Sequence, residues 1–271
     1  MATLKIKYLA TSIQMQMHLL VFLPESVASE IVEMPRDRLK VLWLLHGEGG
    51  DCSDWTRLSM IEHYAQEANI ALVMPNIDNS MYMDMAHGGY PYFTYLMEDL
   101  PRHVRNLVQI LSDKAEDNFV AGISTGGYGA VKWVLRDPEM FSGCACLSGD
   151  IDIVSALRKK EEEGKLSDDW TAAFGSASRI ANTTDDNLFL IKQLVEKEGS
   201  LPSIFLSYSE HDDGFVGNRQ AVHNLHMQGV DIQCYEEPSQ HGWPFWNARI
   251  KNFIDTVVNP VHSNGGKNVA T

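Results

Sequence analysis

The sequence NFVAGISTGGYGAVKWVL (residues 118–135) joins an apolar run to an amphipathic segment through a glycine-rich turn. The apolar run shows no polar alternation, which is typical of a strand buried on both faces, and the amphipathic segment predicts a helix. The turn contains Gly122, Ser124 and Gly126 in the pattern Gly-x-Ser-x-Gly. Glycines leave room for a serine in strained backbone, and the start of the helix places positive potential near its hydroxyl. Ser124 is therefore a candidate nucleophile; the alternative is an ordinary N-cap serine on a glycine-rich turn.

Further apolar runs on both sides of this turn predict strands, and amphipathic segments between them predict helices. The first two strands have no helix between them, which indicates that they pair antiparallel and precede the parallel part of the sheet. The later alternation of strand and helix predicts an α/β fold with a mostly parallel sheet of about eight strands and helices on both faces. The predicted strands are 4–10, 17–23, 39–45, 70–75, 117–122, 143–148, 203–208 and 230–236. The predicted helices are 55–68, 98–113, 126–137, 217–228 and 245–257.

Residues 150–200 interrupt this alternation, because they contain helical patterns and no apolar run of strand type. We expect a helical insertion that forms a cap over the site. Residues 1–258 are expected to form one domain, and the aperiodic tail 259–271 to be flexible.

The charge of the chain excludes several classes of partner. Its 271 residues contain 22 Lys and Arg against 36 Asp and Glu, which gives a net charge of −14. Such a chain is repelled by phosphate backbones and anionic lipid, so we expect no nucleic acid and no membrane as partner. No apolar run approaches the roughly 18 residues of a membrane span, and no signal peptide is recognisable. Together with four cysteines expected to be free thiols, this predicts a cytoplasmic protein.

The segment HGEGG (residues 46–50) directly follows the predicted strand that ends in VLWLL. A glycine-rich turn at this place supplies half of the oxyanion hole in hydrolases that carry a Gly-x-Ser-x-Gly turn. The donors would be the backbone N–H groups of Glu48 and Thr125, since the Glu48 carboxylate has to point away from a developing negative charge. The alternative for these residues is a packed loop.

Two later loops contain the other groups that a serine nucleophile needs. SEHDDGFVGNR (residues 209–219) follows a buried strand and contains acidic candidates, and QHGWPFWN (residues 240–247) places His241 in a loop after the last strand. Ser124, Asp212 and His241 then follow in the order Ser…Asp…His of the α/β-hydrolase fold, each at the carboxyl end of a predicted strand. Such a triad activates the serine through the histidine and forms an acyl-enzyme. The alternative for the acidic loop is a solvated turn or a helix cap.

The motifs GISTGGYGA, HGEGGDCSDW, SEHDDGFVGNR and HGWPFW together resemble the putative-esterase family of α/β-hydrolases. This family includes tributyrin esterases, S-formylglutathione hydrolase (esterase D), and acetylxylan and feruloyl esterases, and the resemblance is strongest to the tributyrin-esterase branch. It places the family's serine on Ser124 and its His-x-Trp-x-x-Trp pattern on His241, Trp243 and Trp246.

The sequence departs from the family at two places near the site. The family commonly has Met after the serine, where this chain has Thr125, and its acid lies in a Thr-Glu-Asp run, where this chain has Ser209–Asp213. Counting back from Asn218 favours Asp212 as the acid, while Asp213 stays open.

The resemblance also implies that the Met- and Tyr-rich loop 81–97 borders the pocket, with Tyr82 a candidate wall beside Trp243 and Trp246. The alternative for this loop is simple packing.

The function expected from these residues and this resemblance is a serine carboxylesterase acting on short-chain acyl esters. An S-formylglutathione hydrolase-like thioesterase and a carbohydrate (acetyl or feruloyl) esterase are the enzymatic alternatives. A catalytically silent α/β-hydrolase that binds a ligand is the non-enzymatic alternative. We expect a small-molecule acyl ester as substrate, no cofactor and no metal, and a homo-oligomer is compatible with the resemblance.

Overall fold

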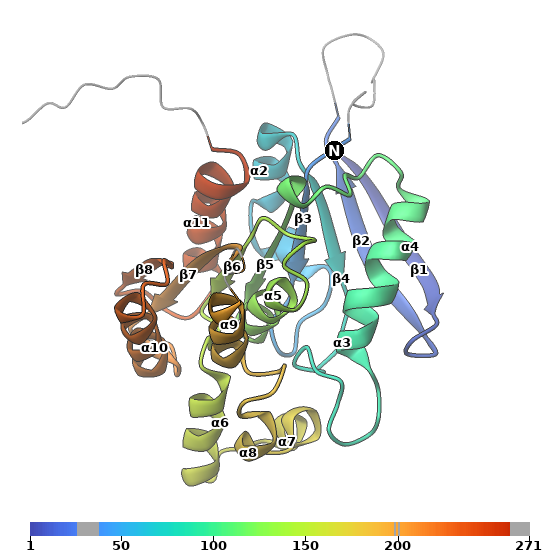
Figure 1. The fold of residues 1–271 in the computed structure, drawn as a ribbon. Helices are drawn as coiled ribbons and strands as arrows, with labels where there is room; N and C mark the ends of the chain where they lie inside the picture. The colour runs from blue at the N-terminus through green and yellow to red at the C-terminus, as the bar shows by residue number, and fades with distance from the viewer. Residues whose placement is uncertain (26–37, 198, 200, 261–271) are drawn as a thin grey trace, which may run out of the picture.

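An eight-stranded sheet forms the centre of the protein in the computed structural model, which describes residues 1–25, 38–197, 199 and 201–260 (Figure 1). The strand order is β1-β2-β4-β3-β5-β6-β7-β8. The strands are β1 (Ala2–Ala10), β2 (Met15–Leu23), β3 (Val41–Leu45), β4 (Ala71–Pro75), β5 (Asn118–Ile123), β6 (Gly143–Leu147), β7 (Ser203–Ser209) and β8 (Gln233–Glu237). Each overlaps a strand predicted from the sequence.

The strand directions confirm the predicted fold class. β1 and β2 pair antiparallel, and β2 joins β4 antiparallel, whereas all pairs from β4 through β3 and β5 to β8 are parallel. Every residue of β3, β4, β5 and β6 is buried, which explains why their sequences show no alternation of apolar and polar residues.

Helices cover both faces of this sheet and divide the core into two parts. The helices are α1 (Asp54–Leu58), α2 (Ile61–Ala68), α3 (Tyr92–Thr94), α4 (Leu100–Leu107), α5 (Thr125–Arg136), α6 (Ile153–Glu162), α7 (Asp168–Phe174), α8 (Ala177–Ile180), α9 (Asn187–Glu196), α10 (Phe215–Met227) and α11 (Trp243–Phe253). In β3, Val41, Trp43 and Leu45 pack into one apolar cluster with α4, α5 and α10, while Leu42 and Leu44 pack into the other with α1, α2 and α11.

Two predicted helices differ from the structure. The helix predicted over 55–68 is divided into α1 and α2 because Ser59 is extended, with φ −139° and ψ 176°. The helix predicted over 98–113 begins earlier, with α3 and a π-helical turn, and ends at Leu107. It stops there because the next residues pair with Leu39, whose N–H donates to the carbonyl of Ile110 over 2.8 Å.

The segment between β6 and β7 is helical, as predicted, and contains α6 to α9. Figure 1 shows α6, α7 and α8 together at one end of the molecule. The segment is tied to α5 at Asp185, whose carboxylate lies 2.6 Å from the buried Lys132 ammonium. The carbonyl of Asp185 accepts a hydrogen bond of 2.8 Å from the Tyr128 hydroxyl. The predicted flexible tail lies outside the described residues from residue 261 onward.

Candidate active site

Ser124 lies on the turn between β5 and α5 in a backbone conformation that side chains rarely adopt. Its φ is 51° and its ψ is −123°. The turn is held because the Ser124 N–H donates to the carbonyl of Leu147 over 2.8 Å, and the Gly127 N–H donates to the Ser124 carbonyl over 2.9 Å. A strained residue fixed in this way is a frequent mark of a functional site.

The two glycines that flank Ser124 are required by close backbone contacts. A Cβ atom at Gly122 would lie 2.0 Å from the carbonyl oxygen of Gly126. A Cβ atom at Gly126 would lie 2.5 Å from the carbonyl oxygen of His46. β5, α5 and the loop after β3 therefore lie so close together that no side chain fits at either position.

We expect Gly122→Ala to destabilise the protein by about 3 kcal/mol, because the new methyl group meets a backbone oxygen that cannot move without displacing α5. Urea unfolding followed by circular dichroism measures the change. Gly217→Ala is the matched control: nothing lies within 4 Å of a Cβ there, and its helical position predicts a gain of about 0.5–1 kcal/mol. Equal stability of the two variants would contradict the close contact.

The loop after β3 is fixed by His46, which is buried. The Ile77 N–H donates to His46 Nε2 over 3.2 Å, and His46 Nδ1 lies 2.8 Å from the Gly47 carbonyl. Burial lowers the pKa of His46, so the ring is neutral and carries its proton on Nδ1. The Tyr82 hydroxyl donates to the His46 carbonyl over 2.6 Å. His46 is thus a structural support for the loop that contains Glu48.

The two predicted oxyanion donors retain free hydrogen-bonding capacity. Within the described parts of the chain, neither the Glu48 N–H nor the Thr125 N–H is donated to an acceptor. Thr125 is the first residue of α5, where the helix dipole favours negative charge. The Glu48 carboxylate is bound by the Trp170 indole, whose Nε1–H donates to Oε2 over 3.0 Å.

Asp212 and His241 are hydrogen-bonded to each other although they are far apart in the sequence. Asp212 Oδ1 lies 2.6 Å from His241 Nδ1, and Asp212 Oδ2 accepts the Ser209 N–H over 2.8 Å. Asp212 is buried. Asp213, the alternative acid, is exposed and lies 3.7 Å from the Lys160 ammonium. The structure thus brings Asp212, and not Asp213, to the histidine.

Ser124, Glu48 and His241 line one cavity of about 340 Å³. No hydrogen bond between Ser124 Oγ and His241 is present among the described residues, and such bonds are often long in enzymes without substrate. The complete lining is Glu48, Ser124, Ser148, Asp150, Lys160, Trp170, His211, Asp213, Gly214 and His241.

The three predicted wall residues lie outside this lining. Tyr82 is buried behind the loop of His46, where a Cβ on Gly129 would lie 2.3 Å from its ring. Trp246 packs edge-on against the His241 ring at a centroid distance of 4.9 Å, and its indole N–H donates to Ser148 Oγ over 3.0 Å. Trp243 packs against Trp246 and Trp55. Trp246 thus packs directly against the His241 ring, and Trp243 in turn supports Trp246.

Several lining residues were not predicted from the sequence. Ser148 and Asp150 follow β6 directly, and the rule that open α/β sheets bind ligands at the carboxyl ends of strands could have found them. Lys160 and Trp170 come from the helical insertion, where no sequence signal separates them from ordinary helix residues.

Two further properties of the described residues concern metals and membranes. They contain no group of three or more His, Cys, Asp and Glu side chains arranged to hold a metal ion. In the same residues, no helix combines the length and the hydropathy needed to cross a membrane.

Comparisons with known proteins identify the family of the chain. The family model described as Putative esterase matches residues 10–254. An acetyl esterase of Caldicellulosiruptor saccharolyticus is 26% identical over 260 residues, which are 94% of this chain and 97% of that protein.

Two solved structures from Staphylococcus aureus share the fold. The fluorophosphonate-binding serine hydrolase FphF, substrate bound, has a TM-score of 0.84 and 29% identity, covering 95% of this chain and 98% of that chain. The S-formylglutathione hydrolase FrmB, as apoenzyme, has a TM-score of 0.82 and 29% identity, covering 95% and 99%. The chain therefore belongs to the putative esterase family and is a carboxylic ester hydrolase with the α/β-hydrolase fold.

Proposed function

We propose that this chain is a serine carboxylesterase that cleaves short-chain acyl esters through Ser124, His241 and Asp212. One observation carries the proposal: a serine on a strained turn and a histidine bonded to a buried aspartate line the same cavity. We also propose that residues 1–258 act as one catalytic domain, with the helices of residues 150–200 as a cap that contributes Lys160 and Trp170 to the cavity.

The mechanism follows from the chemistry of these groups. His241 Nε2 takes the proton of the Ser124 hydroxyl while Oγ attacks the ester carbonyl. The tetrahedral intermediate collapses when His241 gives this proton to the leaving alkoxide, which departs as the alcohol. Water then attacks the acyl-enzyme and loses a proton to His241, which passes this proton to Ser124 Oγ as the carboxylic acid leaves. Asp212 keeps the Nδ1 proton in place and stabilises the imidazolium formed in each step.

The backbone N–H groups of Glu48 and Thr125 are the proposed oxyanion donors. Each is free to donate, and each such donor typically stabilises the transition state by about 3–4 kcal/mol. The bond from Trp170 to the Glu48 carboxylate supports this role, since it engages a negative charge that would otherwise oppose the oxyanion.

The lining of the cavity supports a small acyl group and a polar alcohol. Its volume of about 340 Å³ is near the lower end of the volumes usual for ligand pockets. Most of its lining side chains are charged or polar. A long alkyl chain would find little apolar surface there. The name of the curated relative, acetyl esterase, supports the same size of acyl group.

A thioesterase of the S-formylglutathione hydrolase type is the second candidate, because a protein with that name shares the fold at 29% identity. The same triad would cleave a thioester, and the polar cavity would accept a hydrophilic thiol. A higher kcat/KM for S-formylglutathione than for every oxygen ester would favour this candidate.

We further propose a cytoplasmic location, since all four cysteines are free thiols, as is usual in a reducing compartment. Two of them, Cys144 and Cys146, are fully buried in β6.

The acyl-length profile tests the proposed function. We expect kcat/KM to be highest for p-nitrophenyl acetate or butyrate and lower by about tenfold or more for the octanoate, with the palmitate hardly cleaved, because the longer chains exceed the cavity. Initial rates at 405 nm measure the profile. A preference for the palmitate would contradict a short-chain esterase. If the protein cleaves none of the four esters, the thioesterase becomes the favoured candidate.

A further inference from the structure

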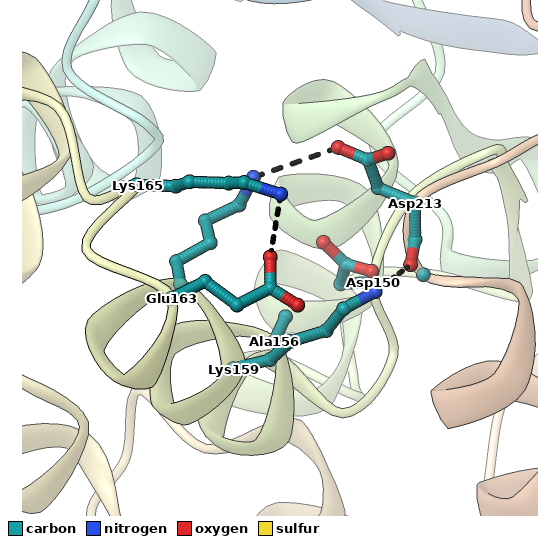
Figure 2. Close-up of a pocket in the computed structure, with 8 residues that line it drawn as sticks. Asp150, Ala156, Lys159, Glu163, Lys165 and Asp213 are labelled. Atoms are coloured by element: carbon teal, nitrogen blue, oxygen red, sulfur yellow. Dashed lines mark hydrogen bonds and ion pairs between the residues drawn. The ribbon is translucent and has the colours of Figure 1, made fainter.

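Asp150 lies where the cavity of Ser124 meets a second pocket. It follows the carboxyl end of β6 and lines both the 340 Å³ cavity and an adjoining pocket of about 150 Å³. Figure 2 shows its carboxyl group between Lys159 of α6 and Asp213. The two spaces adjoin at four residues that line both, namely Asp150, Lys160, Asp213 and Gly214.

The backbone around Asp150 is held by one buried side chain, Asn218 of α10. Its Nδ2 donates to the carbonyl of Gly149 over 2.9 Å, and its Oδ1 accepts the N–H of Ile151 over 3.0 Å. The residues before and after Asp150 are thereby fixed, which pre-organises its side chain. Gly214 gives that side chain its space, since a Cβ there would lie 1.8 Å from Asp150 Oδ1.

The Asp150 carboxyl group nevertheless has no hydrogen-bond or ion-pair partner among the described residues. The lysines around it bind elsewhere: Lys159 donates to the main-chain carbonyl of Asp213 over 3.3 Å, and Lys165 pairs with Glu163 over 2.8 Å. Lys160 lies over the Trp170 ring at 4.9 Å. A fixed carboxyl group with unused bonding capacity, facing a catalytic cavity, is a typical substrate-binding group.

Burial raises the pKa of the Asp150 carboxyl to about 6. The Lys160 ammonium opposes the shift, while further carboxylates add to it, namely Asp213, Asp212 and Asp152. The group is therefore largely ionised at pH 7.5 and largely protonated at pH 5. At neutral pH the cavity lining carries three carboxylates, those of Glu48, Asp150 and Asp213, against the single ammonium of Lys160. This balance attracts hydrogen-bond donors and cations and repels anions.

The strand order places Asp150 and the oxyanion donor of Glu48 on opposite sides of Ser124. β5 leads into Ser124, and β3, on one side of it, leads into Glu48 with its oxyanion donor. On the other side, β6 leads into Asp150 and β8 leads toward His241. Because His241 protonates the leaving oxygen in the proposed mechanism, we place the alcohol part of the ester on the side of Asp150.

We propose that Asp150 is a specificity-determining residue that accepts a hydrogen bond from a donor group, an ammonium or a hydroxyl, on the alcohol part of the ester. The inference rests on the proposed esterase function and deepens it: the preferred substrates are short acyl esters of amino alcohols or of polyols, not esters of simple alkanols.

Two pairs of acetates of matched shape test this role. 2-(Dimethylamino)ethyl acetate, protonated at neutral pH, is compared with 3-methylbutyl acetate, and 2-hydroxyethyl acetate with propyl acetate. Acetate release is followed in a pH-stat, and the kcat/KM ratio within each pair is the readout. An effect of pH on the catalytic step itself affects both members of a pair equally and cancels in the ratio.

For the wild type at pH 7.5 we expect a ratio of about 10 or more for at least one pair, the size of a hydrogen bond to a charged group. An ammonium preference falls toward 1 at pH 5, where Asp150 is protonated, whereas a hydroxyl preference persists because the protonated carboxyl still accepts. The two donor classes are thereby distinguished.

Three variants identify the residue. Asp150→Asn lowers the ammonium ratio to about 2 or less, since it removes the charge and keeps the shape. Gly214→Ala also lowers the ammonium ratio to about 2 or less, although Asp150 is still present, because the new methyl group displaces the Asp150 carboxyl group. The backbone of Gly214 accepts alanine, since its φ is −84°. Asp152→Asn is the matched control: it removes an equal charge outside the cavity lining, keeps a residue type that caps α6, and changes the ratio less than about twofold.

Ratios near 1 for both pairs in the wild type would overturn the assignment. An ammonium preference that survives Asp150→Asn, or a preference of either kind that survives Gly214→Ala, would overturn it as well. If the wild type cleaves none of the acetates, including p-nitrophenyl acetate, the proposed esterase function fails. If it cleaves all of them without preference, the function stands and the role of Asp150 alone is wrong.

Discussion

Ser124→Ala should lower kcat for p-nitrophenyl acetate by about 10⁴- to 10⁶-fold, because no other group can form the acyl-enzyme. The residual rate comes from the oxyanion donors and from substrate binding. The fold should be retained, since the variant keeps a Cβ at the strained position and the Ser124 hydroxyl makes no hydrogen bond among the described residues. Unchanged thermal unfolding checks this.

Ser148→Ala is the matched control, since Ser148 lines the same cavity and also has a positive φ of 55°. Its hydroxyl accepts the Trp246 indole N–H, so we expect a loss of a few-fold only. A fluorophosphonate probe gives an independent readout: the wild type and Ser148→Ala should gain the mass of one phosphonyl group, and Ser124→Ala should gain none. If Ser124→Ala still hydrolyses p-nitrophenyl acetate at the rate of the wild type, or is still labelled by the probe, Ser124 is not the nucleophile.

Much of the fold could be predicted from the sequence because the central strands are buried on both faces. Residues such as Trp43 and Leu42 face opposite layers of helices, so an uninterrupted apolar run marks a strand of a parallel sheet. The break at Ser59 and the early end of α4 at Leu107 could not be predicted. The first depends on the extended conformation of one residue and the second on pairing with Leu39, and neither leaves a pattern in the local sequence.

The candidate triad could be predicted to the extent that chain order determines it. Ser124, an acid of residues 209–219 and His241 each follow a strand, and the carboxyl ends of neighbouring parallel strands bring them to one edge. The choice between Asp212 and Asp213 needed coordinates, because adjacent residues of a turn point in different directions. Asp150 and Trp170 were missed for a related reason: their importance comes from what the insertion and the turn at Gly214 place beside them.

The pair Asp212→Asn and Asp213→Asn tests the assignment of the acid. Asp212→Asn should lower kcat by about 10⁴-fold, because an amide in contact with His241 Nδ1 no longer holds the proton there and cannot stabilise the imidazolium. Asp213→Asn should change kcat less than about threefold, since its carboxylate is exposed and its ion pair with Lys160 is long. Steady-state kinetics with p-nitrophenyl acetate measures both.

The comparison is informative because the two variants have the same chemistry, neighbouring positions and the same change in net charge. If both variants remain folded, a difference of several orders of magnitude reflects the contact with His241, which Asp212 makes over 2.6 Å and the exposed Asp213 does not make. Because Asp212 also accepts the Ser209 N–H, its variant needs a folding control, for which thermal unfolding and fluorophosphonate labelling at long times are suited. Slow but complete labelling of Asp212→Asn would show an intact site with a poorly activated serine. An equal loss of kcat in both variants would instead indicate an effect of the charge of the loop. A greater loss of kcat in Asp213→Asn would identify Asp213 as the triad acid.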